Sequence, residues 1–370
     1  MNIIIFIIVL AILIFVHELG HFIFAKKTGL FVEEFSIGFP PRIFSFKKGE
    51  TKYSVGAIPL GGYVKIFGED YDTEDGEKKS DTMDKNYHRR FTNQSKKTQA
   101  LVLVAGVAFN ILLAWLFFSI AFMSGMSVSV GQFGGELIKD PNLILLDVLP
   151  NSPAEEAGLE AGDIILYLNT GSKTLQNFTD ATEAQIFIAS SGGQEIEVLY
   201  KRAGETILTR LVPADNIIAG KSAIGVSFDV MGTAKFSAPR AVLEGAKTTM
   251  FLTVATVLGL ANFIVGIFTG ASDLSQISGP VGIVSLVGNA FEFGWVYLLS
   301  FTALISINLA VINLFPIPAL DGGRLLFILI EAIKKSPIKP RVANMLNLAG
   351  FSLLILLMVV ITFNDVVRLF

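Results

Sequence analysis

Two histidines, four residues apart, and a glutamate beside the first carry the clearest chemistry in the sequence. His17, Glu18 and His21 form the pattern His-Glu-x-x-His. On a helix, residues four apart share a face, so the two imidazoles can bind one metal ion. In this pattern the histidines are typical zinc ligands, and the glutamate is placed to act as a general base. The alternative is a chance match or a satisfied polar cluster.

The motif lies inside a hydrophobic run, residues 2–25, which we expect to span a membrane. Polar side chains in such a helix are costly and usually functional. The run has no basic residues before it and no small-residue cleavage site. We therefore interpret it as a retained first span rather than a signal peptide. The sequence thus favours a metalloprotease whose active site lies within the membrane.

The composition is that of a membrane protein. Of the 370 residues, 52% are hydrophobic and 16% are charged. The net charge of -3 gives no indication of nucleic-acid binding. Because cysteine is absent, disulfides and thiolate metal ligands are excluded.

Residues 26–97 are polar, and we predict a small membrane-associated β-sheet in them. Pro59 removes a backbone donor, which favours an edge strand, and an extended peptide could pair with such an edge. The candidate substrate contacts there are Gly61, Gly62 and Tyr63. The alternative is a sheet that only caps the helices. We also expect a mobile charged loop at 69–84 and a surface position for His88.

A second span is predicted at residues 99–123 and completes an N-terminal membrane half, residues 1–126. Within it, Gly106 permits close helix approach and Asn110 can hydrogen-bond across helices. For Asn110, a packing role and a catalytic role remain equally open, and we include it among the candidate substrate contacts.

Residues 127–214 have the composition of a soluble domain. The run at 152–164, Ser-Pro-Ala-Glu-Glu-Ala-Gly-Leu-Glu-Ala-Gly-Asp-Ile, resembles a recurring PDZ signature. This resemblance implies one PDZ domain and a possible peptide ligand. The excess of acidic over basic residues around it places the domain outside the cytoplasm.

The charge pattern also limits the number of spans. Two further runs, 293–316 and 345–364, are long enough to span and lie in a C-terminal membrane half, residues 291–370. Between them lies a basic cluster, which should be cytoplasmic. That orientation requires four spans, so we expect the uncharged run 248–272, within a linker at 215–290, to be interfacial or re-entrant.

Asp321 is the candidate third metal ligand. We expect it at the cytoplasmic end of the third span, and the four-span arrangement puts His17 and His21 at the same depth. Pro316 and Pro318 should break the helix and let Asp321 turn toward the metal. Asn313 could hold an extended substrate or satisfy carbonyls freed by the prolines.

These motifs together resemble the site-2 protease family of intramembrane metalloproteases, in its bacterial regulator-of-sigma-E-protease branch. The resemblance covers essentially the whole chain, including Gly106 to Asn110 and the Asn-x-x-Pro-x-Pro-x-x-Asp-Gly run at 313–322. It implies that His17, His21 and Asp321 bind Zn²⁺ and that Glu18 activates water. It further implies that Asn313, with Asn308 upstream, contacts substrate.

The sequence departs from the family pattern in two places. Val107 stands where the family usually has proline. Only one PDZ domain is present where the best-known Gram-negative members have two.

The predicted fold class is thus a polytopic α-helical membrane protein. It has four transmembrane helices, a small β-sheet and one extracytoplasmic PDZ domain. The expected location is the plasma membrane, with the N-terminus outside and the active site toward the cytoplasm. By resemblance, the substrates are single-span membrane proteins, such as anti-sigma factors, and remnant signal peptides.

Two other functions remain alternatives. One is a catalytically silent membrane scaffold that uses its PDZ domain. The other is a membrane-anchored zinc protease that acts on soluble polypeptides, although the apolar flanks of His17 and His21 argue against it.

Overall fold

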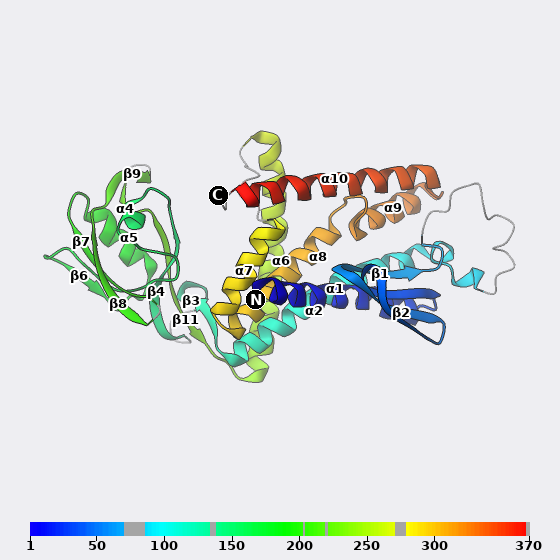
Figure 1. Cartoon of the computed structure of the whole chain (residues 1–370), viewed down its shortest axis with the longest axis horizontal. Helices are drawn as coiled ribbons and strands as arrows, with labels where there is room; N and C mark the ends of the chain where they lie inside the picture. Colours follow the sequence, from blue (N-terminus) through cyan, green and yellow to red (C-terminus); the bar gives the residue numbers. More distant parts are fainter. Residues whose placement is uncertain (70–85, 134–137, 203, 219–220, 271–278, 368–370) are drawn as a thin grey trace. The chain divides into compact units, whose positions relative to one another are not determined.

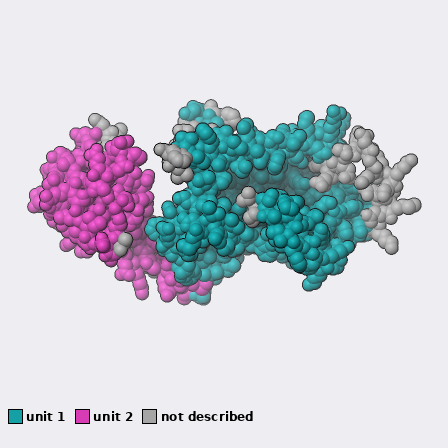
Figure 2. Space-filling model, viewed as in Figure 1, with its two compact units in different colours: residues 1–121, 238–370 teal, residues 122–237 magenta. Residues whose placement is uncertain are grey.

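A computed structural model describes residues 1–69, 86–133, 138–202, 204–218, 221–270 and 279–367. Most of the expected mobile loop at 69–84 lies outside these residues. The chain divides into two compact units, whose helices and strands are labelled in Figure 1 and which Figure 2 distinguishes by colour. Unit 1 contains residues 1–121 and 238–370, and unit 2 contains residues 122–237.

Unit 1 is built mainly of helices. Among the described residues, five helices are long and apolar enough to cross a membrane. They are α1 (Asn2–Lys27), α2 (Lys96–Ser124), α6 (Ala238–Thr269), α8 (Trp295–Leu314) and α10 (Pro340–Val367). Two shorter helices, α7 (Pro280–Glu292) and α9 (Asp321–Lys334), flank α8 along the chain.

Helix α6 differs from the expectation for residues 248–272. It is one continuous helix of 32 residues, without the break in the chain that a re-entrant segment contains. An interior glycine such as Gly259 costs a helix only about 1 kcal/mol, which a long apolar run can absorb. In Figure 1, α6 runs crosswise to α1 and α10.

Apolar side chains lock the helices of unit 1 together. Leu13 of α1 is buried against Leu113 of α2 and Val287 of α7, and residues of α8 pack around them. Near the C-terminal end of α10, the carboxylate of Asp365 accepts hydrogen bonds from the backbone N–H groups of Gly279 and Gly282, at 3.0 and 2.8 Å. It thereby caps the start of α7.

A second apolar cluster joins the elements that surround the histidine motif. It contains buried residues from α1, α2, α9, both strands of a small sheet and the 3-10 helix η3 (Phe91–Asn93). Another 3-10 helix, η2 (Tyr87–Arg89), precedes η3 and leaves His88 exposed, as predicted.

The small sheet consists of two long antiparallel strands, β1 (Val32–Lys48) and β2 (Thr51–Ile66). Both strands bend, so the first part of β1 pairs with two separate parts of β2. Ile37, for example, lies opposite Val55 on one side and Gly62 on the other. Residues 62–66 of β2 therefore form an outer edge, which no other described strand covers.

Unit 2 is a β-rich unit with a seven-stranded antiparallel sheet in its described residues. The strand order is β3-β11-β4-β5-β7-β8, and β6 pairs with β5. Its buried core is formed by strand residues together with Ala184 and Ile188 of α5 (Ala181–Ser190), Ala154 of α4 (Pro153–Glu156) and three loop residues, Leu159, Phe178 and Ile224. The strands are β3 (Met126–Ser129), β4 (Lys139–Val148), β5 (Ile164–Asn169), β6 (Thr174–Gln176), β7 (Ile196–Arg202), β8 (Glu205–Leu211) and β11 (Val226–Ala234).

The shorter elements of unit 2 lie between these strands in the sequence. The helices are α3 (Val130–Phe133), α4 (Pro153–Glu156) and α5 (Ala181–Ser190), and a separate strand pair consists of β9 (Ala214–Ile218) and β10 (Lys221–Ala223).

Unit 2 extends past the predicted domain end at residue 214. Strand β11 lies between β3 and β4 in the sheet, so it is an internal strand and not part of a linker. Strand β11 pairs with β3 and β4, which lie about 80 to 100 residues earlier in the chain. The local sequence pattern around β11 could not predict such a distant pairing.

Candidate metal centre

His17 and His21 lie one turn apart on α1, and their rings meet edge to face. The two Nε2 atoms are 3.2 Å apart, and both residues are buried. The four-residue spacing brings the imidazoles together on one face of the helix, as the motif predicts.

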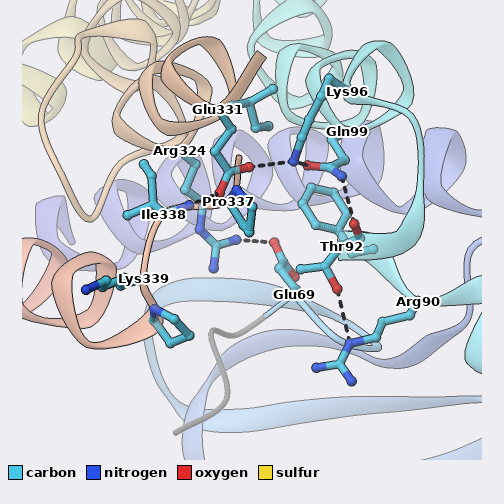
Figure 3. Close-up of a pocket in the computed structure, with 13 residues that line it drawn as sticks. Glu69, Arg90, Thr92, Lys96, Gln99, Arg324, Glu331, Pro337, Ile338 and Lys339 are labelled. Carbon is cyan, nitrogen blue, oxygen red and sulfur yellow. Dashed lines mark hydrogen bonds and ion pairs between the residues drawn. The ribbon is translucent and has the colours of Figure 1, made fainter. Parts of the chain in front are cut away.

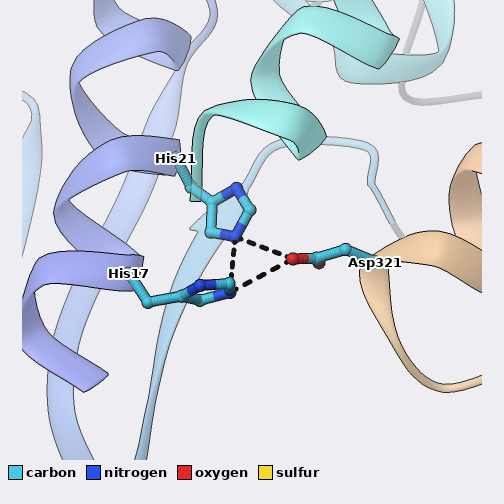
Figure 4. Close-up of side chains that lie close together, drawn as sticks. All are labelled: His17, His21 and Asp321. Carbon is cyan, nitrogen blue, oxygen red and sulfur yellow. Dashed lines mark hydrogen bonds and ion pairs between the residues drawn. The ribbon is translucent and has the colours of Figure 1, made fainter. Parts of the chain in front are cut away.

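Asp321 reaches the same point from the other end of the chain. It is the first residue of α9 rather than part of α8, which ends at Leu314. Its Oδ2 lies 3.1 Å from Nε2 of His17 and 3.2 Å from Nε2 of His21. Figure 4 shows the three side chains converging. Two imidazole nitrogens and one carboxylate oxygen fit a catalytic zinc site, in which water takes a further position.

Glycines allow the close packing around these three side chains. A Cβ at Gly106 of α2 would overlap the ring of His21, and one at Gly20 would overlap the backbone of Ala105. Gly322 and Gly323 follow Asp321 and pack against the carbonyls of the turn between α8 and α9. The glycines thus bring α2 and the start of α9 against the histidine face of α1.

Helix α2 also contacts the outer ring nitrogens. Nδ1 of His21 donates to the backbone carbonyl of Val102 at 2.9 Å. The amide of Asn110 lies 3.2 Å from Nδ1 of His17. Both Nε2 atoms therefore point toward Asp321, and contacts of this kind orient metal-ligating histidines.

Glu18 lies beside the ligands in a cavity of about 450 Å³. The cavity is bounded on one side by the outer edge of β2, including Gly62 and Tyr63. A Cβ on Gly62 would approach Cγ of Glu18 to 3.1 Å, so the edge strand passes directly over this carboxylate. The site therefore combines three candidate metal ligands, a further carboxylate and the outer edge of a β-strand.

Comparison with known proteins agrees with this geometry. The model of peptidase family M50 matches residues 5–357. This chain belongs to peptidase family M50. The zinc metalloprotease RasP of Oceanobacillus iheyensis is 30% identical, over 99% of this chain and 98% of the relative. The regulator of sigma-W protease RasP of Bacillus subtilis is 31% identical, over 100% of this chain and 99% of the relative.

The chain is therefore a zinc metalloendopeptidase of the site-2 protease family, and the predicted zinc dependence is confirmed. The catalytically silent scaffold is not supported, because His17, Glu18, His21 and Asp321 are all present and gathered at one place.

The other predicted substrate contacts of this M50 peptidase occupy different places. Asn308 accepts a hydrogen bond from Thr256 of α6 at 3.4 Å, and Gly61 packs against the ring of Phe39. Asn313 is half-buried near the end of α8. The described residues that line the cavity include none of these three. Asn110 is fully buried behind His17 rather than facing the cavity.

Sequence reasoning missed an ion pair beside the metal ligands. Arg324, one turn after Asp321 on α9, pairs with Glu69, and both residues line the catalytic cavity. Both also line a second cavity, of about 390 Å³ (Figure 3). There Glu331 accepts from Lys96 at 2.5 Å and from the backbone of Ile338 at 2.9 Å. One indication of this ion pair was present in the sequence, since Arg324 is a cation only three residues after Asp321.

Proposed function

We propose that this M50 peptidase cleaves peptide bonds in the transmembrane segments of single-span membrane proteins. One observation carries the proposal. His17 and His21 lie on the apolar helix α1, Asp321 meets them from the start of α9, and the outer edge of β2 borders the same cavity. By resemblance, the substrates are proteins of the anti-sigma factor type and remnant signal peptides. The name of the Bacillus subtilis relative, regulator of sigma-W protease, supports a regulatory substrate.

His17, His21 and Asp321 would hold zinc, which when bound acidifies water and polarises the scissile carbonyl. Glu18 takes the proton from the attacking water and delivers it to the leaving amine. Its place in the cavity, beside the ligands but not among them, suits this role.

The outer edge of β2 binds the substrate by strand addition. A helical peptide bond is shielded by its own hydrogen bonds, so the substrate must unwind before cleavage. Residues 62–66 form the outer edge of the small sheet, next to Glu18, and no other described strand pairs with that edge. Backbone pairing there would replace the hydrogen bonds that the substrate helix loses.

Four helices span the membrane, and α6 lies at its surface. Helices α1 and α8 both lead to the metal site at their C-terminal ends, so they run in the same direction. Contacts of Val102 with His21 and of Asn110 with His17 support an opposite direction for α2. A crossing by α6 would reverse α8, and the 13-residue α7 is too short to cross back. The active site then faces the cytoplasm, and unit 2 lies outside it.

Unit 2 is a PDZ domain that binds a peptide. A groove of about 440 Å³ runs between α5 and residues 222–228. Ile186 of α5, which is 66% exposed, lies on its wall. An extended peptide would pair with backbone groups there and place an apolar side chain against Ile186.

The catalytic proposal is tested with Glu18→Gln and Asp321→Asn, both measured for bound zinc and for cleavage of a single-span model substrate. We expect Glu18→Gln to keep zinc and lose cleavage, and Asp321→Asn to lose both. Cleavage by Glu18→Gln at the wild-type rate would refute the role of Glu18. Cleavage of a soluble peptide but not of the membrane substrate would refute the intramembrane site.

A further inference from the structure

We propose that Asn110 is a positioning residue of the zinc site. Its side-chain oxygen accepts the Nδ1–H of His17 and so fixes the tautomer in which Nε2 is free for the metal. This inference rests on the zinc site proposed above, and it assigns to Asn110 a role other than contact with substrate.

One face of α2 is arranged around the two histidines. Val102, Gly106 and Asn110 follow at intervals of four residues and therefore lie on the same face of the helix. The carbonyl of Val102 accepts from Nδ1 of His21 at 2.9 Å. Gly106 leaves room for the imidazole ring of His21, because a Cβ there would overlap it. Asn110 meets Nδ1 of His17 at 3.2 Å. Each histidine thus has one partner on α2 for its outer nitrogen.

The chemistry of a neutral imidazole decides which atom of Asn110 must face His17. A ring that binds metal through Nε2 carries its proton on Nδ1, and that proton needs an acceptor. Oδ1 of Asn110 is buried and is the side-chain atom without a hydrogen-bond partner among the described residues. Oxygen and nitrogen of an amide exchange places by a half-turn of the terminal group. That turn brings Oδ1 to the Nδ1–H of His17.

Packing between helices does not account for the side chain. The backbone carbonyl of Asn110 already accepts the hydroxyl of Ser306 on α8 at 2.8 Å. The side chain is fully buried, and the described residues that line the catalytic cavity do not include Asn110. Its side-chain amide lies within hydrogen-bond distance of His17. An amide between two helices could point elsewhere, but this one faces a metal ligand.

The test is the zinc dissociation constant of purified full-length variants, measured by competition with a chelator. Asn110→Leu keeps the size of the side chain and removes the acceptor. We expect it to weaken zinc binding about 10- to 100-fold, the range found when outer partners of metal ligands are removed. Asn110→Asp keeps an acceptor oxygen in place and should bind zinc at least as tightly as wild type.

Ser119→Ala is the matched control. Ser119 is buried on the same helix and donates to the carbonyl of Trp115 at 2.7 Å, away from the metal site. It should lose some thermal stability without a change in zinc affinity. If Asn110→Leu does not fold, Asn110→Ala removes the acceptor without a branched side chain.

Zinc affinity equal to wild type in the folded Leu or Ala variant would overturn the proposal. Equal weakening by Asn110→Asp and Asn110→Leu would also overturn it, since the acceptor would then be irrelevant. The result is independent of the role of Glu18, because zinc binding is measured without substrate. Failure of the catalytic proposal and failure of this one are therefore distinguishable.

Discussion

Gly106 shows how little space surrounds the two histidines. It packs directly against both imidazole rings. A Cβ atom added at this position would lie 3.0 Å from Cε1 of His17 and would overlap Nε2 of His21. The metal ligands are therefore held by the shape of α2 as well as by hydrogen bonds.

A single methyl group at this position should disturb the metal site. In Gly106→Ala, the added carbon overlaps the ring of His21, which must turn away from Asp321 and from the carbonyl of Val102. We expect zinc affinity to fall by at least about 10-fold, since the orienting contact is lost. Chelator competition on the purified variant measures this.

Gly259→Ala on α6 provides the control for helix propensity. A Cβ there meets nothing within 4 Å. This variant should keep zinc affinity and gain up to about 1 kcal/mol of stability. Unchanged zinc affinity in Gly106→Ala would contradict the packing argument.

At this scale the sequence predicted much of the metal site. The spacing of His17 and His21 predicted that both lie on one face of a helix. The distribution of basic residues predicted that Asp321 lies at the same depth in the membrane as the two histidines. Val102 could not be predicted, because it contributes a backbone carbonyl, which any residue possesses. Gly106 was recognised as a site of close approach, but its neighbour is an imidazole ring rather than a helix backbone.

Between elements, one carboxylate ties three segments of unit 1 together. Glu50, in the turn between β1 and β2, accepts from Lys26 at the end of α1 at 2.5 Å. It also accepts two hydrogen bonds from Arg89 of η2, at 2.7 and 2.8 Å. The hydrogen bonds from Arg89 and Lys26 lower the pKa of Glu50 to about 2.

This network should make stability depend on pH in the acid range. The pKa of Glu50 is lower in the folded state than in the unfolded chain, so the carboxylate contributes fully above about pH 4.5. Its contribution is lost as the pH falls toward 2. The difference in unfolding temperature between wild type and Glu50→Gln, measured in detergent, should therefore shrink below pH 4.5.

Glu33→Gln is the control, because its partner Lys65 is largely exposed and such pairs contribute little. It should change the unfolding temperature less than Glu50→Gln at pH 7. A wild-type advantage over Glu50→Gln that grows as the pH falls would refute the assignment.

The sequence predicted the elements unevenly. The long apolar runs located α1, α2, α8 and α10, because hydropathy alone identifies a span. Helix α9 was missed, since the residues between the last two spans were considered only for their basic cluster. Its buried Glu331, which pairs with Lys96, interrupts the apolar pattern and depends on a contact 235 residues away.

For the whole molecule, the relative directions of α1, α2 and α8 follow from the metal site. In Figure 1 the start of α1 and the end of α10 lie at the same end of unit 1. An even number of spans has this property. The proposed arrangement puts the turn between β1 and β2 and the turn between α9 and α10 on the cytoplasmic side.

Cysteine labelling can test this arrangement directly, because the natural chain contains no cysteine. We expect a membrane-impermeant maleimide to label Ser172→Cys in intact cells. Lys48→Cys and Lys334→Cys should react only after the membrane is opened. All three positions are exposed in the structure.

Lys334→Cys separates the two counts of spans. With five spans it would be labelled in intact cells, whereas with four it is protected. Labelling of Lys48→Cys from outside would instead contradict the orientation of α1. The basic cluster near Lys334 indicated this orientation in the sequence, but only the convergence of α1 and α8 gives it a geometric basis.

His17 and Asp321 are separated by 304 positions along the chain. During synthesis, both histidines and Glu18 therefore enter the membrane long before the third ligand leaves the ribosome. A nascent chain that has completed α1, α2 and unit 2 has a base and two ligands, but no complete metal site. Proteolytic activity should consequently arise only after nearly all of the protein has been made, which protects neighbouring nascent membrane proteins from premature cleavage.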